Sequence, residues 1–306
     1  IKMTSVTFYG GVNEVGGNKI LLEDKDTKVL LDFGMSFGRR GDYFDEFMSP
    51  RTPTGLKDFL EMGLIPNIKN AYRTDLLKMM DRTDTETDID AVLLTHAHAD
   101  HADYISFLNE NIPLYMGDTC KLLLEAIEGR TARDFEREIL SFKPRPLVRS
   151  DEEIQRDVRT FRTGDKFKIG SLEVEPIHVD HSVPGAYGFI IYTSSGPVVY
   201  TGDIRLHGTK PEMTQDFVKK AIEVKPIALL AEGTRINDLE SDESEQKVYN
   251  DCNSHVEKSD KLAIADFNFK DMDRFRTFYN IAKEIGILFK SGKGEFVYTR
   301  FKSKKI

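Results

Sequence analysis

The 306-residue sequence contains only two cysteines, and neither has a partner at metal-binding spacing. Cys120 and Cys252 lie far apart in the sequence, with no Cys-x-x-Cys motif around either. Their arrangement excludes a disulfide scaffold and a zinc knuckle built from thiolates. We expect two buried, reduced thiols, as in a cytoplasmic protein.

Long apolar runs are also missing. No segment has the roughly 20 consecutive apolar residues that a membrane-spanning helix needs. No charged stretch is followed by an apolar one, which is the pattern of a secretion signal. Residue 1 is isoleucine rather than methionine, so we expect the natural start of the protein to lie upstream. A cytoplasmic protein with no membrane partner is the prediction.

Positive charge is in deficit, since the formal net charge is −8. This balance argues against a protein that coats nucleic acid without specificity. It leaves a nucleic-acid enzyme open, because a carboxylate-rich metal site adds negative charge that bound cations offset locally. Basic clusters at residues 39–40, 143–149 and 302–305 are more typical of a solvated surface than of a binding track.

Short apolar runs bounded by turn residues run through the first 231 positions and predict strands. We expect these strands at residues 6–9, 19–22, 28–31, 91–94, 167–169, 172–177, 188–192, 198–200 and 227–231, the fourth and the last of them buried. Residues 39–87 are polar and contain several prolines, which predicts a long irregular segment with short helices. Helices are expected at 104–108 and within 119–141.

The pattern changes near residue 236. A polar helix is predicted at 242–257, a strand at 261–267 and an amphipathic helix at 271–285. Such alternation of strands and helices indicates a second α/β domain. We find no internal repeat and no low-complexity segment.

Three histidines and an aspartate directly follow the predicted strand 91–94, in the motif His-Ala-His-Ala-Asp-His at 96–101. His96 and His98 are two residues apart, so in extended backbone they project to one side and can hold one ion. Asp100 and His101 come after a turn and can address a second ion. Imidazole nitrogen and carboxylate oxygen suit zinc, and two ions about 3.5–4 Å apart can share a bridging hydroxide. The motif predicts a hydrolytic site with two zinc ions.

A complete two-metal centre needs ligands from other segments. His178 and His181 follow the predicted strand 172–177, and Asp203 follows the predicted strand 198–200. A carboxylate can bridge two cations, because each of its oxygens can bind one. Taken alone, Asp203 could equally be a turn or helix-cap residue.

The order of these motifs resembles the metallo-β-lactamase superfamily. The glycine-rich segment 10–18, Leu-Leu-Asp-Phe-Gly at 30–34, His-Ser-Val-Pro at 181–184 and Thr-Gly-Asp-Ile-Arg at 201–205 resemble the β-CASP nucleases, in particular ribonuclease J. The likeness covers essentially the whole chain. It implies an α/β fold in which residues 1–235 form an αββα metallo-β-lactamase sandwich with the metal site. Residues 236–306 would be the beginning of a β-CASP α/β domain.

The same resemblance implies a ligand set. His96, His98 and the distant His181 would hold the first metal. Asp100 and His101 would hold the second metal, and Asp203 would bridge the two. His178 would be a neighbour of the site rather than a ligand.

Three acidic residues receive further roles. Asp100 could also accept the proton of the nucleophile. Glu232 matches the acidic residue that opens the β-CASP insertion, where it supports a histidine acting on the leaving group. Asp32 resembles the strand-end aspartate that braces the histidine loop, with an ordinary turn residue as the alternative.

The family pattern contains two more histidines that this sequence does not match. After Asp203 only His207 and His255 remain. His207 is too close to Asp203, and His255 lies in a predicted polar helix. We therefore expect the 306 residues to be part of a longer protein, with a degenerate member as the alternative. The second metal would lack a ligand in this chain.

Three functions are compared. The favoured one is hydrolysis of phosphodiester bonds in RNA, by exonucleolytic or endonucleolytic attack of a zinc-bound hydroxide, with manganese or magnesium as alternative ions. The expected substrate is single-stranded RNA, and a homodimer is open. The alternative is a thioester or lactone hydrolase, against which the segment from Glu232 onward argues. A non-catalytic subunit is the third, disfavoured because six matching ligands are present.

Overall fold

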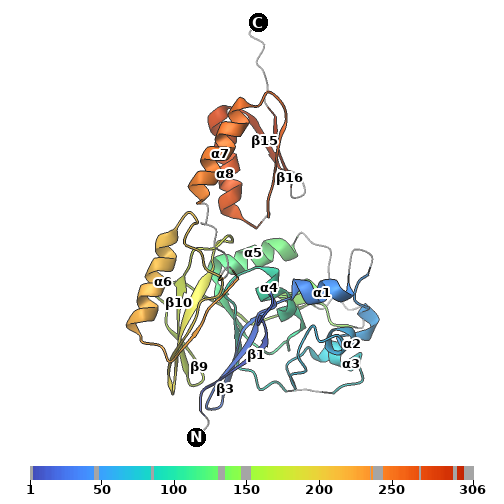
Figure 1. Ribbon diagram of the computed structural model, residues 1–306. Helices are drawn as coiled ribbons and strands as arrows, with labels where there is room; N and C mark the ends of the chain where they lie inside the picture. The colour runs from blue at the N-terminus through green and yellow to red at the C-terminus, as the bar shows by residue number, and fades with distance from the viewer. Residues whose placement is uncertain are drawn as a thin grey trace. The chain divides into compact units, whose positions relative to one another are not determined.

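The computed structural model describes residues 3–44, 48–83, 86–129, 135–145, 153–234, 236, 244–268, 270–291 and 295–299. The chain divides into two compact units (Figure 1). The first unit comprises Ile1–His178, Gly185–Asp203 and Lys220–Thr234. The second unit takes Val179–Pro184, Ile204–Lys219 and Arg235–Ile306. Each unit is described by itself.

A six-stranded sheet begins the first unit, in the order β1-β2-β3-β4-β5-β8. Its strands are β1 (Ser5–Gly10), β2 (Lys19–Asp24), β3 (Thr27–Phe33), β4 (Ala91–Leu93), β5 (Leu114–Gly117) and β8 (Val158–Phe161). The first three strands pair antiparallel, whereas β3, β4, β5 and β8 are parallel neighbours. Parallel strands end at the same edge of a sheet, so the segments after β3 and β4 emerge side by side.

A five-stranded sheet, in the order β13-β12-β11-β10-β9, forms the other half of the first unit. Its strands are β9 (Phe167–Ile169), β10 (Leu172–His178), β11 (Tyr187–Thr193), β12 (Gly196–Tyr200) and β13 (Ala228–Leu230). All pairs are antiparallel except β12 with β13. Two short strands, β6 (Ser141–Phe142) and β7 (Ile154–Gln155), form a separate hairpin.

Helices follow β3, β4, β5 and β12. They are α1 (Phe37–Tyr43), η1 (Thr52–Thr54), α2 (Lys57–Glu61), α3 (Thr74–Lys78), α4 (Ala99–Ala102), η2 (Asp103–Phe107), α5 (Asp118–Glu128), η3 (Phe135–Arg137) and α6 (Pro211–Glu223), where η marks a 3₁₀ helix. The expected irregular segment with short helices at 39–87 is confirmed. No helix in the described residues is long and apolar enough to cross a membrane.

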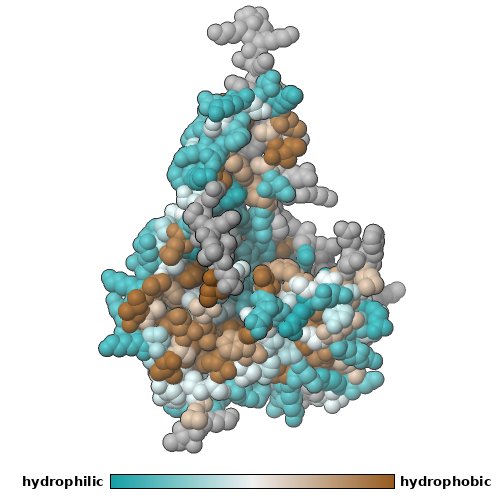
Figure 2. All heavy atoms as spheres, in the orientation of Figure 1, coloured by the Kyte–Doolittle hydropathy of each residue, from teal (hydrophilic) through white to brown (hydrophobic). Residues whose placement is uncertain are grey.

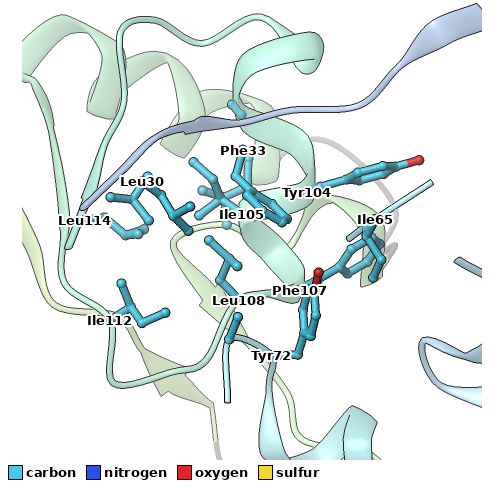
Figure 3. Packing of buried hydrophobic residues seen from close by; sticks show 14 of the residues in the cluster. Leu30, Phe33, Ile65, Tyr72, Tyr104, Ile105, Phe107, Leu108, Ile112 and Leu114 are labelled. Atoms are coloured by element: carbon cyan, nitrogen blue, oxygen red, sulfur yellow. The ribbon is translucent and has the colours of Figure 1, made fainter. Parts of the chain in front are cut away.

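Alternation along β3 shows how the layers form. Val29 and Leu31 join the apolar cluster between the two sheets, whereas Leu30 joins the cluster on the opposite face. A strand has a side-chain period of two, so both faces of this strand are buried. Figure 3 shows Leu30 and Leu114 of the sheet packing with Ile105 and Leu108 from the helical layer. The predicted αββα sandwich is confirmed.

Two details differ from the prediction. The predicted buried strand at 227–231 is an edge strand, β13, in which Leu229 is 60% exposed. It pairs only with β12, so its outer side has no neighbour among the described strands. Figure 2 shows apolar side chains gathered over α6 and the strands beside it. The predicted helix at 104–108 is instead a 3₁₀ helix that follows the single turn α4.

The second unit contains α7 (Glu245–Lys258), β14 (Ala263–Asp266), α8 (Met272–Ile285), β15 (Leu288–Ser291) and β16 (Glu295–Thr299). The three strands form an antiparallel sheet in the order β14-β16-β15, so the expected sequence of helix, strand and helix is followed by two strands that were not predicted. Phe278 and Ile281 of α8 pack with Cys252 of α7. Cys252 is only half-buried, whereas Cys120 is fully buried as predicted.

Asp24, at the end of β2, connects the two sheets of the first unit. Its buried carboxylate accepts hydrogen bonds from the hydroxyls of Thr4 (2.7 Å), Ser194 (2.6 Å) and Ser171 (2.9 Å). Ser171 and Ser194 lie in the turns before β10 and before β12. Burial alone would raise the pKa of Asp24, but these hydrogen bonds outweigh it and lower the pKa below the usual value.

We predict that Asp24→Ala lowers the free energy of unfolding by about 1–3 kcal/mol, because several buried donors lose their acceptor. Denaturant unfolding followed by circular dichroism measures the change. Asp26→Ala removes an exposed carboxylate from the same turn and is the control, with an expected change below about 0.5 kcal/mol. Equal effects of the two substitutions would contradict the role of Asp24.

The contribution of Asp24 should also depend on pH. Its pKa is lower in the folded state than the value of about 3.9 in an unfolded chain. The stabilisation is therefore fully present above about pH 4 and is lost as the pH falls through the folded-state pKa. The difference in unfolding free energy between the wild type and Asp24→Asn, measured from pH 2 to 7, should shrink at the acidic end. A constant difference would contradict the assignment.

Candidate metal centre

Asp32, in β3, organises the histidine loop that follows β4. Its buried carboxylate accepts hydrogen bonds from Thr95 N (2.8 Å), Thr95 Oγ1 (2.8 Å), Tyr200 OH (2.7 Å) and Nδ1 of His101 (2.7 Å). A buried carboxylate is stable only when it is well hydrogen-bonded, and this one has four donors. It therefore fixes the start of the loop and the ring of His101 together. The sequence-based role of Asp32 as a brace agrees with these contacts.

The loop rests on the backbone of the segment after β3. A side chain at Gly34 would place its Cβ 1.7 Å from the carbonyl oxygen of Asp100, so only glycine fits there. Met35 N donates to Ala99 O (2.9 Å), and Asn18 N donates to Asp100 O (3.0 Å). These contacts hold the single turn α4, from which Asp100 and His101 project.

Within the described residues, two groups of side chains could each hold a metal ion. In each group the ligand atoms all lie within 4.8 Å of one another; the first consists of His96, His98, His181 and Asp203, and the second of Asp100, His101 and Asp203. The structure thus brings together all six residues that the resemblance implied as ligands, in the same two sets. Asp203 is common to both groups, as a bridging carboxylate would be.

The donor set fits divalent ions. The Oδ1 atom of Asp203 lies 3.1 Å from Nε2 of His101, and its Oδ2 atom lies 3.9 Å from Nε2 of His96. Nε2 of His96 lies 3.1 Å from Nδ1 of His98. Ligands at about 2.0–2.1 Å from a tetrahedral ion are separated by about 3.3 Å. The observed separations are close to this spacing, and the nitrogen and oxygen atoms are ligands that zinc accepts.

The acidic side chains around the second ligand group favour a positive charge at that position. Burial opposes protonation of His101, but Asp32 on one side of the ring and Asp203 on the other outweigh it, so the pKa of His101 is well above its usual value. Burial, with Asp203 nearby, raises the pKa of Asp100 above the usual range. The carboxylates therefore create a negative potential at the position that a cation would occupy.

Two residues from the sequence analysis lie outside both groups. His178, the last residue of β10, stacks on the ring of Tyr187 with centroids 4.0 Å apart. Glu232 is exposed after β13, and its backbone N–H donates to Thr201 Oγ1 at 3.3 Å. The catalytic roles of Glu232 and of Asp100 stay predictions. His255 lies on α7, as expected, with Nδ1 2.7 Å from the carbonyl oxygen of Asp251.

Sequence reasoning missed three residues that shape the site. The Nδ2 atom of Asn18 lies 3.0 Å from Nε2 of His101. Thr95 Oγ1 lies 3.0 Å from Nδ1 of His96, and Tyr200 donates to Asp32. Asn18 ends the glycine-rich motif and Thr95 begins the histidine motif, so their positions in motifs were a usable signal. Nothing in the sequence around Tyr200 indicates its contact.

Residues 72–240 match the family model described as the beta-lactamase superfamily domain. This stretch contains the histidine motif, His181 and Asp203, and it covers more than half of the chain. The chain belongs to the metallo-β-lactamase superfamily. Members of this superfamily are hydrolases, and the fold implies binding of divalent metal, in agreement with the two ligand groups.

Curated relatives and a solved structure extend the comparison. Ribonuclease J of Mycobacterium tuberculosis is 27% identical over 210 residues, which are 68% of this chain and 29% of the relative. Ribonuclease J of Helicobacter pylori is 24% identical over 210 residues, 67% of this chain and 23% of the relative. The chain thus spans less than a third of these relatives. A crystal structure of a protein of unknown function from Enterococcus faecalis V583 has the same fold, with a TM-score of 0.68, 24% identity, and coverage of 92% of this chain and 63% of the other.

Substitution of Asp32 should weaken metal binding. We predict that Asp32→Asn lowers metal affinity by about 10- to 100-fold, because the amide offers only one acceptor oxygen and its NH₂ group faces donors. Competition with a chromogenic chelator measures the affinity. Asp157→Asn, a surface change outside the site, is the control and should bind like the wild type. Unchanged affinity of Asp32→Asn in a folded protein would show that Asp32 does not orient the ligands.

Proposed function

We propose that this chain is the metal-binding part of an enzyme that hydrolyses phosphodiester bonds in RNA. The observation that carries the proposal is the pair of adjoining ligand groups that share Asp203. Two divalent cations held by such adjoining groups would suit a substrate with a charged, oxygen-rich reacting centre, because they could offset charge on both the attacking and the leaving oxygen. Two zinc ions are proposed, with manganese or magnesium as alternatives.

The ions, when bound, would lower the pKa of water and stabilise negative charge on the phosphate. The residues of the chain would hold and orient these partners. His96, His98 and His181 would bind one ion, Asp100 and His101 the other, and Asp203 would contact both. Asp100 is also proposed to accept a proton from the attacking water, since its carboxylate belongs to the second ligand group and would lie beside that water.

The choice of RNA is supported by the names of the curated relatives. Several proteins called ribonuclease J match 67–68% of this chain at 21–27% identity, and another matches 39% of it at 31% identity. We propose that residues 1–235 form the catalytic domain and that residues 236–306 begin a β-CASP domain that would help to bind single-stranded RNA. Glu232, at the junction, is proposed to support the group that assists the leaving oxygen.

Incubation of the natural full-length protein with 5′-monophosphorylated single-stranded RNA and zinc or manganese tests the proposal. Cleavage is expected, and the product pattern distinguishes exonucleolytic from endonucleolytic attack. Turnover of a thioester or a lactone without cleavage of RNA would contradict the RNA assignment.

His98→Ala is the matching variant. We predict that it reduces the cleavage rate by at least about 100-fold, because the first ion loses a ligand. Metal content, measured by plasma mass spectrometry, should fall in parallel. His255→Ala makes the same change on the exposed face of α7 and should retain both rate and metal. Retention of both in His98→Ala would refute its assignment as a ligand.

A further inference from the structure

Arg205 follows Asp203 by two residues and is almost fully buried, with its side chain 8% exposed. It contacts Asp180, the residue immediately before His181. We propose that Arg205 is a positioning residue, which holds His181 in the first ligand group and connects its loop to α8. This inference rests on the metal centre of the proposed function, but it does not depend on the choice of RNA as substrate.

Asp180 is held at its backbone and its side chain by the segment after Asp203. Arg205 Nε donates to Oδ1 of Asp180 (3.0 Å), and Arg205 N donates to its carbonyl oxygen (2.9 Å). Lys210 N donates to Oδ2 (3.3 Å), and the N–H of Asp180 donates to Thr214 Oγ1 (2.9 Å). Asp180 is 4% exposed. With donors on both carboxylate oxygens and both backbone groups paired, Asp180 has little freedom to move.

The fixed position of Asp180 restricts its neighbour. His181 is one peptide away and lies in the eight-residue loop 179–186, which joins β10 to β11. A loop residue loses rotational and translational freedom when the adjacent residue is anchored, so the imidazole is prepared for the ion in advance. The hydrogen bonds that hold Asp180 therefore act on metal affinity through the backbone of His181.

The other end of Arg205 reaches α8. Its Nη2 donates to Oδ2 of Asp273, in the first turn of that helix. Asp180, Arg205 and Asp273 all belong to the second unit. The guanidinium thus lies between two carboxylates, one beside a metal ligand and one on a helix far along the chain. A shift of α8 would be transmitted to the His181 loop.

The ion pair of Arg205 with Asp180 occupies the space directly beside Gly208. A Cβ at Gly208 would lie 2.2 Å from Arg205 Nε and 2.3 Å from Asp180 Oδ2. The absence of a side chain at this position therefore allows the ion pair to close. Arginine suits the role because its planar fork can donate to two acceptors in fixed directions, whereas lysine offers a single point charge.

The effect should be selective for one of the two ligand groups. His181 belongs only to the first group, whereas the second consists of Asp100, His101 and Asp203. Thr201, two residues before the shared Asp203, is anchored independently of Arg205, since its N–H donates to Leu230 O at 2.9 Å. Loss of the contacts that hold Asp180 is therefore expected to weaken binding of the first ion and to leave binding of the second largely unchanged.

The test measures metal binding in the purified protein with Arg205→Met. We expect the affinity of one of two bound zinc ions to fall by about tenfold or more in chelator competition, the range seen for residues that orient ligands. The visible spectrum of the cobalt-substituted protein should change, because the coordination of one ion changes. His181→Ala sets the limit for complete loss of that ligand. Arg205→Lys should give an intermediate affinity.

Arg274→Met is the matched control. Arg274 of α8 forms a comparable two-point ion pair with Glu245 of α7, at 2.8 and 3.2 Å, and has no contact with Asp180 among the described hydrogen bonds. It should lower thermal stability while keeping both ions and the wild-type spectrum. Asp273→Ala keeps the Arg205–Asp180 contact and should weaken the first ion less than Arg205→Met.

Four outcomes decide the inference. Wild-type affinity and spectrum in folded Arg205→Met would overturn it, as would equal losses in Arg205→Met and Arg274→Met. If Arg205→Met does not fold, wild-type binding by Arg205→Lys and Asp273→Ala together would overturn it. Selective loss of the first ion would support it even if the protein cleaves no RNA. If the wild type binds no ion through His181, the first ligand group of the proposed metal centre is refuted, and the inference with it.

Discussion

The site depends on the buried carboxylate of Asp32. It accepts hydrogen bonds from the residue that starts the histidine loop, from a ligand in that loop, and from Tyr200 of the second sheet. Tyr200 ends β12 and is followed three residues later by Asp203. One carboxylate therefore ties together the parallel strand ends of one sheet and the strand end that leads to the shared ligand. Because Asp32 is buried, loss of these donors would leave an unpaired buried charge, which costs free energy.

Buried aspartates with several hydrogen bonds hold other parts of the chain in the same way. Ligands project from short loops, and each loop is held by a buried acidic residue with several donors. Asp32 does this for the histidine motif, and Asp180 does it for the loop of His181. Asp24 has a comparable role at a distance from the site, where it connects turns of the two sheets. These three carboxylates thus have a structural role, and those near the ligands add to the negative potential that attracts cations.

Membership of the metallo-β-lactamase superfamily accounts for the sandwich and for the two ligand groups. The likeness to ribonuclease J is distant and covers a fraction of those longer proteins. In this chain, Arg205 also connects the His181 loop to α8. A residue of this kind would allow a shift of α8 to change the position of the His181 loop within the second unit.

The sequence by itself determined the chemistry of the site. The spacing of His96, His98, Asp100 and His101 requires only local backbone, and the strands before His181 and Asp203 could be recognised from their apolar runs. Short apolar runs bounded by turn residues also predicted most of the sandwich strands. Local patterns were insufficient for α6, for the edge position of β13 and for the strands after residue 287, because pairing partners and exposure depend on distant segments.

Only the tertiary structure decided how distant residues meet. The contacts of Tyr200 with Asp32, of Asn18 with His101, and of Arg205 with Asp180 and Asp273 join segments that no periodicity relates. The sequence thus determined which atoms can bind a metal, since ligand chemistry belongs to individual residue types. The folded chain decided which of them share an ion and what holds them there, because those properties arise from packing between elements.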